Sequence, residues 1–549
     1  MGVLSLIARV QDIQRLRQIL KVFAKYGYGH VIERMGLQSS RLLGVILPQP
    51  SIKSPSDPEQ LRRAFEELGP TFVKLGQVLS TRPDLIPHTY IEEFSKLQDK
   101  VSPFPLEEAR ETFEKELGYS FEEAFLEFDS TPIASASLSQ VYRATLKDGT
   151  RVAVKIQRPG IKPLIKSDID LLYILARIAE TSIPELKLYN PVKIIREFER
   201  AIEKELDFTI EAANAERFRR NFYSSSDICF PKVHDRFSSK RILTMDFIDG
   251  VKITEAPLSG YDPRELARCG LRAVIQMIFR DGFFHADPHP GNVVVTKDGR
   301  LAYLDLGLVG RVSEATRDKM LMLLLAIIRE DFEEVTRIFY KIGIKEDRVD
   351  MEEFRSDVVD ICERHFGKPL KFIELGTFIK DLLEGALRHR IRIPHEYALM
   401  CKALITMEGV GKKLDPDLNI FKEAYPYLTD IFKKRYSLNR LSKDLVTAFV
   451  TVSQLLQEIP PQLKETINSI ERGGVKTNDI PEHKKVFTLE RIVNRVIIAF
   501  LTCLCIAVSI ILFVLSKSLW MVSFSVVWLL AGFLLGIWLI ISILKSRNF

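Results

Sequence analysis

The sequence predicts an α+β protein with two lobes, a helical N-terminal extension and a C-terminal pair of transmembrane helices. Three observations support this architecture. Residues 139–156 alternate between apolar and polar positions around a turn, as in a β-hairpin. Residues 313–459 have helical periodicity almost throughout. Two long stretches near the C-terminus carry no charge.

The composition is that of a large globular protein rather than a disordered or collagen-like chain. Of 549 residues, 46% are hydrophobic and 27% are charged. The net charge of +6 is too small to imply a nucleic-acid partner, for which a clustered basic face would be expected. The six cysteines form no C-x-x-C motif, which argues against a zinc site or a disulfide framework and favours a reducing compartment.

The C-terminal stretches have the length of membrane spans. Residues 496–515 contain only Thr502 and Ser509 as polar members, and residues 519–544 contain no charge, whereas a span needs about 20 residues. The alternative is a pair of buried core helices. Gly532 and Gly536 would let two such helices approach closely. Because the basic residues flank the pair rather than its short link, both ends and the body are expected on the cytoplasmic side of the cell membrane, with membrane lipids as partners.

Helical periodicity also dominates the N-terminal part. Residues 1–45 form a basic amphipathic pattern, which suits either an anionic membrane surface or packing on the main body. A proline-rich sequence at 48–55 indicates a linker. Helical periodicity resumes at Pro58 and continues with breaks to about residue 127. The chain carries no signal-peptide pattern at its start.

The central part predicts alternating strands and helices. After the hairpin, which turns at Asp148-Gly149, we expect a long helix at 193–223, a strand at 241–248, a helix at 263–281 and two short strands around the turn 297–299. The expected segments are therefore a basic helical segment at 1–50, a helical extension at 51–127, a small lobe at 128–250, a helical lobe at 251–435, a helical segment and linker at 436–490, and the transmembrane hairpin at 491–549.

Four polar residues in these elements have the spacing of a nucleotide and metal site. Lys155 ends the hairpin strand Val-Ala-Val-Lys, which suits the α- and β-phosphates of ATP. Asp287 and Asn292 are five residues apart in a loop, and Asp305 follows 18 residues after Asp287. In protein kinases this order supplies the catalytic Asp and two magnesium ligands. We therefore expect a bilobal protein-kinase-like fold that binds ATP.

Histidines in the same loop offer a second interpretation. His285 and His289 flank Asp287, but the prolines at 288 and 290 make this segment a loop rather than a metal-binding helix. Oxygen ligands from Asn292 and Asp305 favour magnesium, or manganese, over zinc. His285 is expected to brace the loop by hydrogen bonding.

Two features of protein kinases are missing from the sequence. Residues 134–137, Ala-Ser-Ala-Ser, occupy the place of the glycine-rich loop, so this loop should sit differently over the nucleotide. No A-P-E motif follows Asp305, so an ordinary segment for holding a peptide substrate is not expected.

These motifs resemble those of the UbiB family of atypical kinase-like proteins, which are linked to ubiquinone biosynthesis. The family's K-x-G-Q motif corresponds to Lys74, Gly76 and Gln77, and its E-x-D motif to Glu205 and Asp207. Its alanine-rich loop corresponds to Ala134, Ser135, Ala136 and Ser137. The resemblance covers roughly residues 55–430 and extends to the C-terminal hairpin.

The resemblance implies roles for further residues. Glu211 would pair with Lys155, Met245 and Phe247 would line the hinge beside adenine, and the K-x-G-Q and E-x-D residues would regulate the site. Because the K-x-G-Q segment would lie where a protein substrate docks, ATP hydrolysis or small-molecule chemistry is favoured over protein phosphorylation. We hypothesise that Lys74 holds this segment closed through Glu205 or Asp207.

The expected function is that of a membrane-anchored, kinase-like ATPase or kinase. It would bind ATP with magnesium and support isoprenoid quinone biosynthesis, with quinone precursors or quinone-biosynthesis proteins as partners. One alternative is a true kinase acting on a lipid or small metabolite. The other is a non-catalytic scaffold of a biosynthetic complex that uses ATP as a switch.

Overall fold

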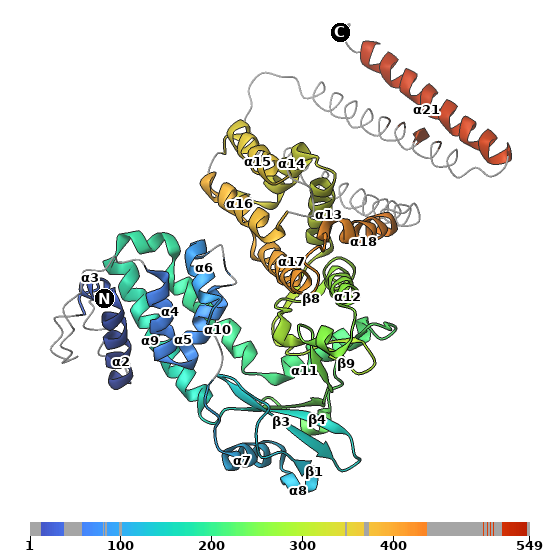
Figure 1. Ribbon diagram of the computed structural model, residues 1–549. Coiled ribbons are helices and arrows are strands. Elements are labelled where there is room, and N and C mark those ends of the chain that lie inside the picture. Colours follow the sequence, from blue (N-terminus) through green and yellow to red (C-terminus); the bar gives the residue numbers. More distant parts are fainter. Residues whose placement is uncertain are drawn as a thin grey trace, which may run out of the picture. The chain divides into compact units, whose positions relative to one another are not determined.

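The computed structural model describes most of the N-terminal part of the chain and part of the C-terminal region (Figure 1). The described residues are 12–37, 57–80, 82, 85–97, 101–345, 349–366, 373–435, 498, 502, 505–506, 509 and 519–545; within the last range, side chains are described for 523–539. The chain divides into two units, Met1–Ser437 and Leu438–Phe549. Each unit is described by itself.

An antiparallel sheet forms the small lobe. Its strands are β1 (Phe125–Phe128), β2 (Ala134–Ser135), β3 (Ser139–Leu146), β4 (Arg151–Gln157) and β6 (Ile242–Asp246), in the order β1-β3-β4-β6 with β2 also on β3. Tyr142 lies opposite Val154 in the register, and both are fully buried, so the alternating apolar residues face one core. Gly149 adopts a φ of 86°, as the predicted turn requires. The predicted hairpin and the strand at 241–248 are thus confirmed.

Two short helices cover the buried face of this sheet. They are α7 (Leu106–Leu117) and α8 (Phe121–Ala124), which lie beside β1 in Figure 1. The rings of Phe113 and Phe121 meet edge to face, with centroids 5.1 Å apart. Ser120 and Glu123 form a reciprocal capping box at the start of α8. The aromatic cluster fixes the sheet that carries Lys155.

A separate helical core joins the N-terminal extension to two helices that follow the hairpin. Leu16, Phe72 and Ile178 are buried together in it. The participating helices are α2 (Ile13–Phe23), α3 (Gly29–Arg34), α4 (Pro58–Leu68), α5 (Pro70–Leu79), α6 (His88–Phe94), α9 (Ile161–Ser182) and α10 (Pro191–Glu205). The sequence analysis missed α9, which packs against α10 and α5.

The described part of the basic N-terminal segment packs on the body of the protein. Leu16, Ile19 and Leu20 of α2 are buried, and the Arg15 Nε donates to the fully buried Asp168 of α9 at 2.7 Å. Of the two interpretations that the sequence left open, packing therefore holds for residues 12–34. Residues 1–11 and 38–56 lie outside the described part.

The prediction of one long helix at 193–223 is wrong. Two helices occupy this stretch, because α10 ends at Glu205 and α11 (Phe208–Asn221) begins three residues later. The Asp207 side chain accepts a hydrogen bond from the Thr209 backbone at 3.1 Å and caps α11. Asp is strongly favoured at such a cap, where it satisfies a backbone N–H that the helix leaves unpaired. The E-x-D motif is therefore the corner between two helices.

The second lobe combines short strands with many helices. One sheet has the order β5-β10-β9-β7, and β8 pairs with β11. The strands of this lobe are β5 (Ile228–Cys229), β7 (Gly250–Lys252), β8 (Phe283–His285), β9 (Val293–Thr296), β10 (Leu301–Tyr303) and β11 (Val309–Arg311). β9 and β10 enclose the predicted turn at 297–299, where Gly299 has a φ of 83°. The helix predicted at 263–281 is observed as α12 (Pro263–Ile275), which continues as a π-helical turn, Gln276–Asp281.

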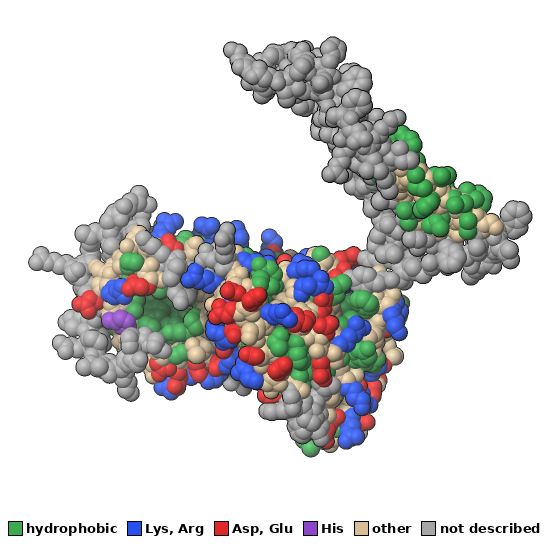
Figure 2. All heavy atoms as spheres, turned by 90° about the horizontal axis from the view of Figure 1, so that it is seen from above, with side chains coloured by type: hydrophobic (Ala, Val, Ile, Leu, Met, Phe, Trp, Pro, Cys, Tyr) green, Lys and Arg blue, Asp and Glu red, His purple; other side chains and the backbone are tan. Residues whose placement is uncertain are grey.

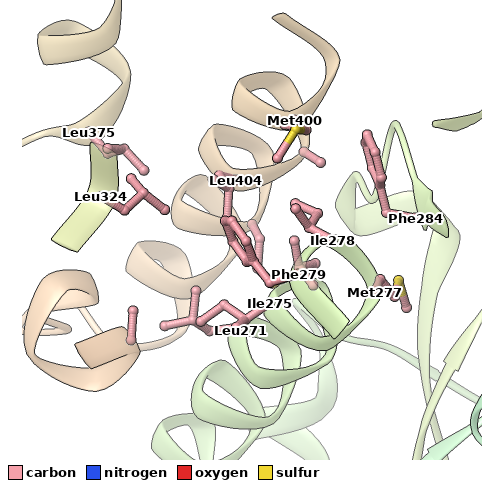
Figure 3. Close-up of a cluster of buried hydrophobic side chains, with 14 of the residues drawn as sticks. Leu271, Ile275, Met277, Ile278, Phe279, Phe284, Leu324, Leu375, Met400 and Leu404 are labelled. Atoms are coloured by element: carbon pink, nitrogen blue, oxygen red, sulfur yellow. The ribbon is translucent and has the colours of Figure 1, made fainter. Parts of the chain in front are cut away.

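Helices fill the rest of this lobe around one apolar core. Figure 3 shows Met400 and Leu404 in the same cluster as Leu271, Ile275 and Ile278 of the α12 segment. The helices are α13 (Glu314–Ile328), α14 (Phe332–Ile342), α15 (Met351–Phe366), α16 (Leu375–Arg388), α17 (His395–Leu414) and α18 (Ile420–Arg435). A small pair of strands, β12 (Ile344–Lys345) and β13 (Ile391–Arg392), interrupts them. The predicted helical text at 436–459 lies outside the described residues.

The C-terminal unit contains the helix α21 (Leu519–Lys545). Its residue Gly532 lies so close to an earlier segment that a Cβ there would be 3.1 Å from the Ile506 Cγ1. The Ser509 hydroxyl donates to the Ser525 carbonyl at 2.8 Å. Across the part of the chain that the structure describes, no helix is both long enough and apolar enough to cross a membrane. The transmembrane hairpin is therefore not confirmed, and most of its first helix, 496–515, is outside that part.

Candidate nucleotide and metal site

Lys155, Glu211 and Asp305 come together from three different elements. The Lys155 Nζ lies 2.8 Å from the Glu211 Oε2 and 3.6 Å from the Asp305 Oδ1. Val154 and Ile156 enter the core of the small lobe, so the alternation of β4 directs Lys155 to the opposite face. α11 supplies Glu211 in its first turn. The pairing that the family resemblance implied between Lys155 and Glu211 is present in the geometry.

The charges of these three groups depend on one another. Burial works against the charged form of Lys155, but Glu211 and Asp305 more than compensate and raise its pKa. Burial also raises the pKa of Glu211, against the effect of Lys155. The ammonium group of Lys155 lowers the pKa of Asp305 and favours its carboxylate form. Lys155 is therefore a charged group held between two acids.

Asp305 stands at a strained point of the backbone and faces open space. Its φ is 50°, in the left-handed region that non-glycine residues seldom adopt and that Asp tolerates better than most. Its side chain is 58% exposed, whereas the Glu211 side chain is 7% exposed. Strained residues of this kind cluster at functional sites. The Asp305 carboxylate is therefore largely exposed to solvent rather than buried in the core.

Asn214 holds this segment in place and was missed by the sequence analysis. Its Nδ2 donates to the Leu306 carbonyl at 3.0 Å, and both residues are buried. Asn214 lies three residues after Glu211, so the two side chains share one face of α11. That spacing, with Glu211 already identified, was the available signal.

His285 braces the loop that carries Asp287, as predicted. Its Nδ1 accepts from the Asp287 backbone N–H at 3.1 Å, and its Nε2 donates to the Leu304 carbonyl at 3.2 Å. Burial lowers the pKa of His285, which favours this neutral tautomer. Since both ring nitrogens are engaged, neither has a free lone pair for a metal ion. His285 therefore links the loop of Asp287 to the strand end before Asp305.

The Asp287 side chain faces a lysine from a distant helix. The Lys402 Nζ of α17 lies 3.3 Å from the Asp287 Oδ2, and both side chains are about one-third exposed. Lys402 was missed, because it stands in ordinary helical text 115 residues after Asp287 and belongs to no motif. Asn292 lies at the other end of the loop, where its carbonyl accepts from the Leu304 N–H at 2.8 Å.

The alanine-rich loop forms a tight turn beside the start of β3. Ala134 and Ser135 pair with β3, and the Ala136 N–H donates to the Ser139 carbonyl at 2.8 Å. Among the described residues, the hydroxyls of Ser135 and Ser137 are buried without a hydrogen-bond partner. A buried hydroxyl without a partner costs stability.

The K-x-G-Q segment is the helix α5, and it is tied to the E-x-D corner. The Lys74 Nζ lies 2.5 Å from the Glu205 Oε1. A Cβ at Gly76 would lie 2.2 Å from the Leu97 Cδ1, so any larger residue would require the Leu97 side chain to move. Gln77 donates to the Leu97 carbonyl at 3.3 Å. After Lys155, Lys74 is a further lysine that lowers the pKa of Asp305, so α5 lies within electrostatic range of the site.

The predicted hinge spans the end of β6 and the residue after it. Met245 lies opposite Ala153 in the register, and the Phe247 N–H donates to the Arg151 carbonyl at 2.9 Å. Phe247 also lines a polar cavity of about 410 Å³, together with residues of the β9–β10 turn such as Lys297 and Arg300. The backbone pairing between β6 and β4 thus continues past Met245 to Phe247.

The residues present fit a metal ion that is shared with phosphate groups. Among the described residues, no group of three or more His, Cys, Asp or Glu could hold a metal ion by itself. Asp305 and Asn292 offer oxygen ligands, and the second oxygen of Glu211 is buried without a hydrogen-bond partner in the described part. Magnesium commonly takes one or two protein carboxylates and completes its coordination with water and substrate phosphates.

Comparison with known proteins gives family matches over both lobes. The model of the ABC1 atypical kinase-like domain matches residues 96–339, and that of the UbiB helical domain matches residues 358–419. A relative from Marinobacter nauticus, named "Probable protein kinase UbiB", is 36% identical over 475 residues, which cover 84% of this chain and 86% of the relative.

Two further relatives and one solved structure extend this comparison. A Pseudomonas aeruginosa protein of the same name is 34% identical, with 86% of this chain and 90% of the relative covered. A Clostridium pasteurianum protein described as "Uncharacterized protein in hydrogenase 1 5'region" is 32% identical, with 89% and 90% covered. The structure of a Mycobacterium tuberculosis protein, Rv3197 with erythromycin, has a TM-score of 0.47 at 23% identity and covers 64% of this chain and 90% of its own.

Proposed function

This chain belongs to the UbiB family of ABC1 atypical kinase-like proteins, and on that premise we propose that it binds ATP with magnesium and hydrolyses or transfers the γ-phosphate. The observation that carries the proposal is the arrangement of Lys155 between Glu211 and Asp305, at 2.8 and 3.6 Å. Protein kinases use a strand lysine paired with a helix glutamate, next to a metal-binding aspartate, to hold ATP.

Each group has a defined task in this chemistry. Lys155 orients the α- and β-phosphates, and Glu211 holds Lys155 in position. Asp287 accepts the proton of the attacking water or hydroxyl. The oxygen of that water or hydroxyl bonds to the γ-phosphorus while the bond between the γ-phosphorus and the ADP oxygen breaks. Asn292 and Asp305 would hold magnesium, which neutralises phosphate charge when bound. His285 fixes the position of the Asp287 backbone throughout.

The segment around Lys74 favours water or a small acceptor over a protein substrate. The side chain of Lys74 is 11% exposed and pairs with Glu205, so α5 is fastened beside the site. By the family resemblance, the segment at 134–137 would replace the phosphate-covering loop of a protein kinase, and the segment at 74–77 would lie where its protein substrate docks. We propose that Lys74, Gly76, Gln77, Glu205 and Asp207 together restrain access to the γ-phosphate.

The C-terminal unit is proposed to attach the protein to a membrane. Among the large apolar side chains of α21, Phe524, Val527, Phe533 and Leu534 are each more than 60% exposed. Figure 2 shows the apolar surface that the described side chains of α21 form. Soluble surfaces seldom carry a contiguous apolar patch of this kind, and lipid would cover it. The close approach of Gly532 to Ile506 supports a paired-helix anchor.

A role in isoprenoid quinone biosynthesis rests on family membership. UbiB-family proteins are linked to ubiquinone biosynthesis, so quinone precursors or quinone-biosynthesis proteins are the proposed partners. A membrane-attached ATPase would act where such hydrophobic precursors reside. The kinase-like body would then lie on the cytoplasmic side of the cell membrane.

Labelled ATP separates this proposal from its two rivals. The purified protein is incubated with magnesium and ATP labelled at the γ-phosphate, with and without a lipid extract of cells. Release of inorganic phosphate supports an ATPase, whereas label in a lipid or small metabolite supports a kinase for that acceptor. Complementation of a deletion strain by the Asp287→Asn variant, together with nucleotide binding but no transfer, would instead support a scaffold that uses ATP as a switch.

A further inference from the structure

The ion pair between Lys402 and Asp287 joins two parts of the chain that match different families of domain. Asp287 lies within residues 96–339, which match the kinase-like domain, and Lys402 lies within residues 358–419, which match the helical domain. Their side chains approach to 3.3 Å. A cation from the helical domain therefore reaches the residue that is placed to receive the proton in phosphoryl transfer.

The position of Lys402 is fixed by the packing of α17. Met400 and Leu404, two residues before and after it, are buried in the core at 0% and 4% exposure. Residues two apart on an α-helix point about 200° apart, so Lys402 lies on the face of α17 opposite to Met400 and Leu404. Figure 3 shows those two side chains in the cluster with Ile278 and Phe279. The backbone of Lys402 is thus held by the core while its ammonium group reaches Asp287.

Among the three lysines at this site, Lys402 is the one whose ammonium group pairs with Asp287. Lys155 is held by Glu211 and Asp305, and Lys74 is 2.5 Å from Glu205, so both ammonium groups already pair with carboxylates other than Asp287. The Lys402–Asp287 pair is about one-third exposed on both sides. Exposed pairs of this kind contribute little stability, so an incoming phosphate can share the ammonium group without a large loss.

We propose that Lys402 is a phosphate-binding residue that holds the γ-phosphate of ATP against Asp287. This inference rests on the proposed nucleotide function and adds a ligand to it from outside the kinase-like domain. The ammonium group neutralises charge on the transferring phosphoryl group while Asp287 takes the proton of the nucleophile. It also makes phosphate binding depend on the position of α17.

A comparison of two nucleotides tests the proposal on the full-length protein. Isothermal titration measures the affinity for a magnesium complex of the β,γ-imido analogue of ATP and for Mg-ADP. The variants are Lys402→Met, which keeps the length of the side chain, Lys402→Arg, which keeps its charge, and Lys413→Met, an exposed lysine on the same helix, as a control. Thermal unfolding of each variant confirms that it is folded.

The γ-phosphate contact predicts a selective effect. Lys402→Met weakens binding of the ATP analogue about tenfold or more, because a hydrogen bond between charged groups is lost, and leaves the affinity for ADP nearly unchanged. Lys402→Arg restores most of the difference, and Lys413→Met has no effect. The role of Lys402 would be overturned if Lys402→Met lost equal affinity for both nucleotides or lost none. It would also be overturned by faster ATP turnover with an unchanged ratio of the affinities for the ATP analogue and ADP. Failure of the parent protein to bind either nucleotide would instead overturn the proposed function.

Discussion

The Nζ of Lys74 lies 2.5 Å from the Oε1 of Glu205, which joins helix α5 to the last residue of α10. Two residues further on, Asp207 caps α11, and that helix carries Glu211 in its first turn. The K-x-G-Q helix is thereby connected to the residue that positions Lys155. We therefore expect a restraint on α5 to act also on Lys155, the residue proposed to bind phosphate.

The first prediction concerns this connection. Lys74→Ala is expected to increase the rate of ATP hydrolysis by up to about fivefold, since loss of an ion pair worth about 1 kcal/mol releases the restrained segment. Phosphate release at saturating ATP is the measurement. Lys96→Ala is the control, because Lys96 also forms an ion pair in the extension, with Glu93, but is 60% exposed. A fall in turnover would mean that Lys74 itself contacts the transferring phosphate.

The second prediction concerns Asp305 as the proposed metal ligand. Asn tolerates the left-handed backbone of Asp305, which has a φ of 50°, so Asp305→Asn removes charge while keeping the conformation. The thermal stabilisation by ATP in magnesium should shrink strongly, because stabilisation grows with affinity. The same assay without magnesium serves as the control. A melting shift equal to that of the parent protein would remove Asp305 from the metal site.

The third prediction follows from Asp281, at the end of the π-helical turn. Burial is the main cause that raises the pKa of its carboxyl from 3.8 to about 6, although Arg280, Arg317 and Arg217 oppose this effect. A carboxyl with a raised pKa binds protons more tightly in the folded state, so its contribution to stability falls as the pH rises through about 6. Asp281→Asn should therefore stabilise the protein more at pH 8 than at pH 5.

Urea unfolding at the two pH values checks this expectation. The exposed Asp235→Asn variant is the control, since surface substitutions usually change stability by less than about 0.5 kcal/mol. An Asp281→Asn effect of the same size at both pH values would show that the carboxyl does not titrate between them.

The fourth prediction concerns membrane attachment. A protein that ends before residue 491 should leave the membrane fraction, because it lacks the apolar surface of α21. Extraction with alkaline carbonate, followed by detection of the kinase-like body, is the measurement. A truncated protein that resists extraction would show an anchor elsewhere. Release of remaining protein by high salt would point to the basic residues near the N-terminus.

The sequence alone predicted the parts of the fold that local chemistry determines. The β3–β4 hairpin followed from alternation and the Asp148-Gly149 turn, and His285 was assigned its bracing role from the prolines around it. The family resemblance supplied Glu211 and the link between Lys74 and Glu205. The roles of the nucleotide and metal residues, and the proposed domain boundaries, stay predictions.

The features that were missed depend on contacts between distant segments. The break between α10 and α11 was hidden because apolar periodicity continues through Leu206, while the cap at Asp207 depends on one side chain. α9 follows the hairpin directly and shares its core with helices more than 80 residues earlier in the chain. Lys402 reaches Asp287 only because α17 packs against the α12 segment, a contact that the local sequence does not predict.

The release of phosphate from ATP by the parent protein and by Asp287→Asn tests the central claim most directly. Asn keeps the size of the side chain but cannot accept the proton of the attacking water. We predict steady phosphate release by the parent protein in magnesium and a decrease of about 100-fold or more in the variant, with nucleotide binding retained in both. Equal rates in the two proteins, at equal affinity for ATP, would contradict the assignment of Asp287 and of the site built around it.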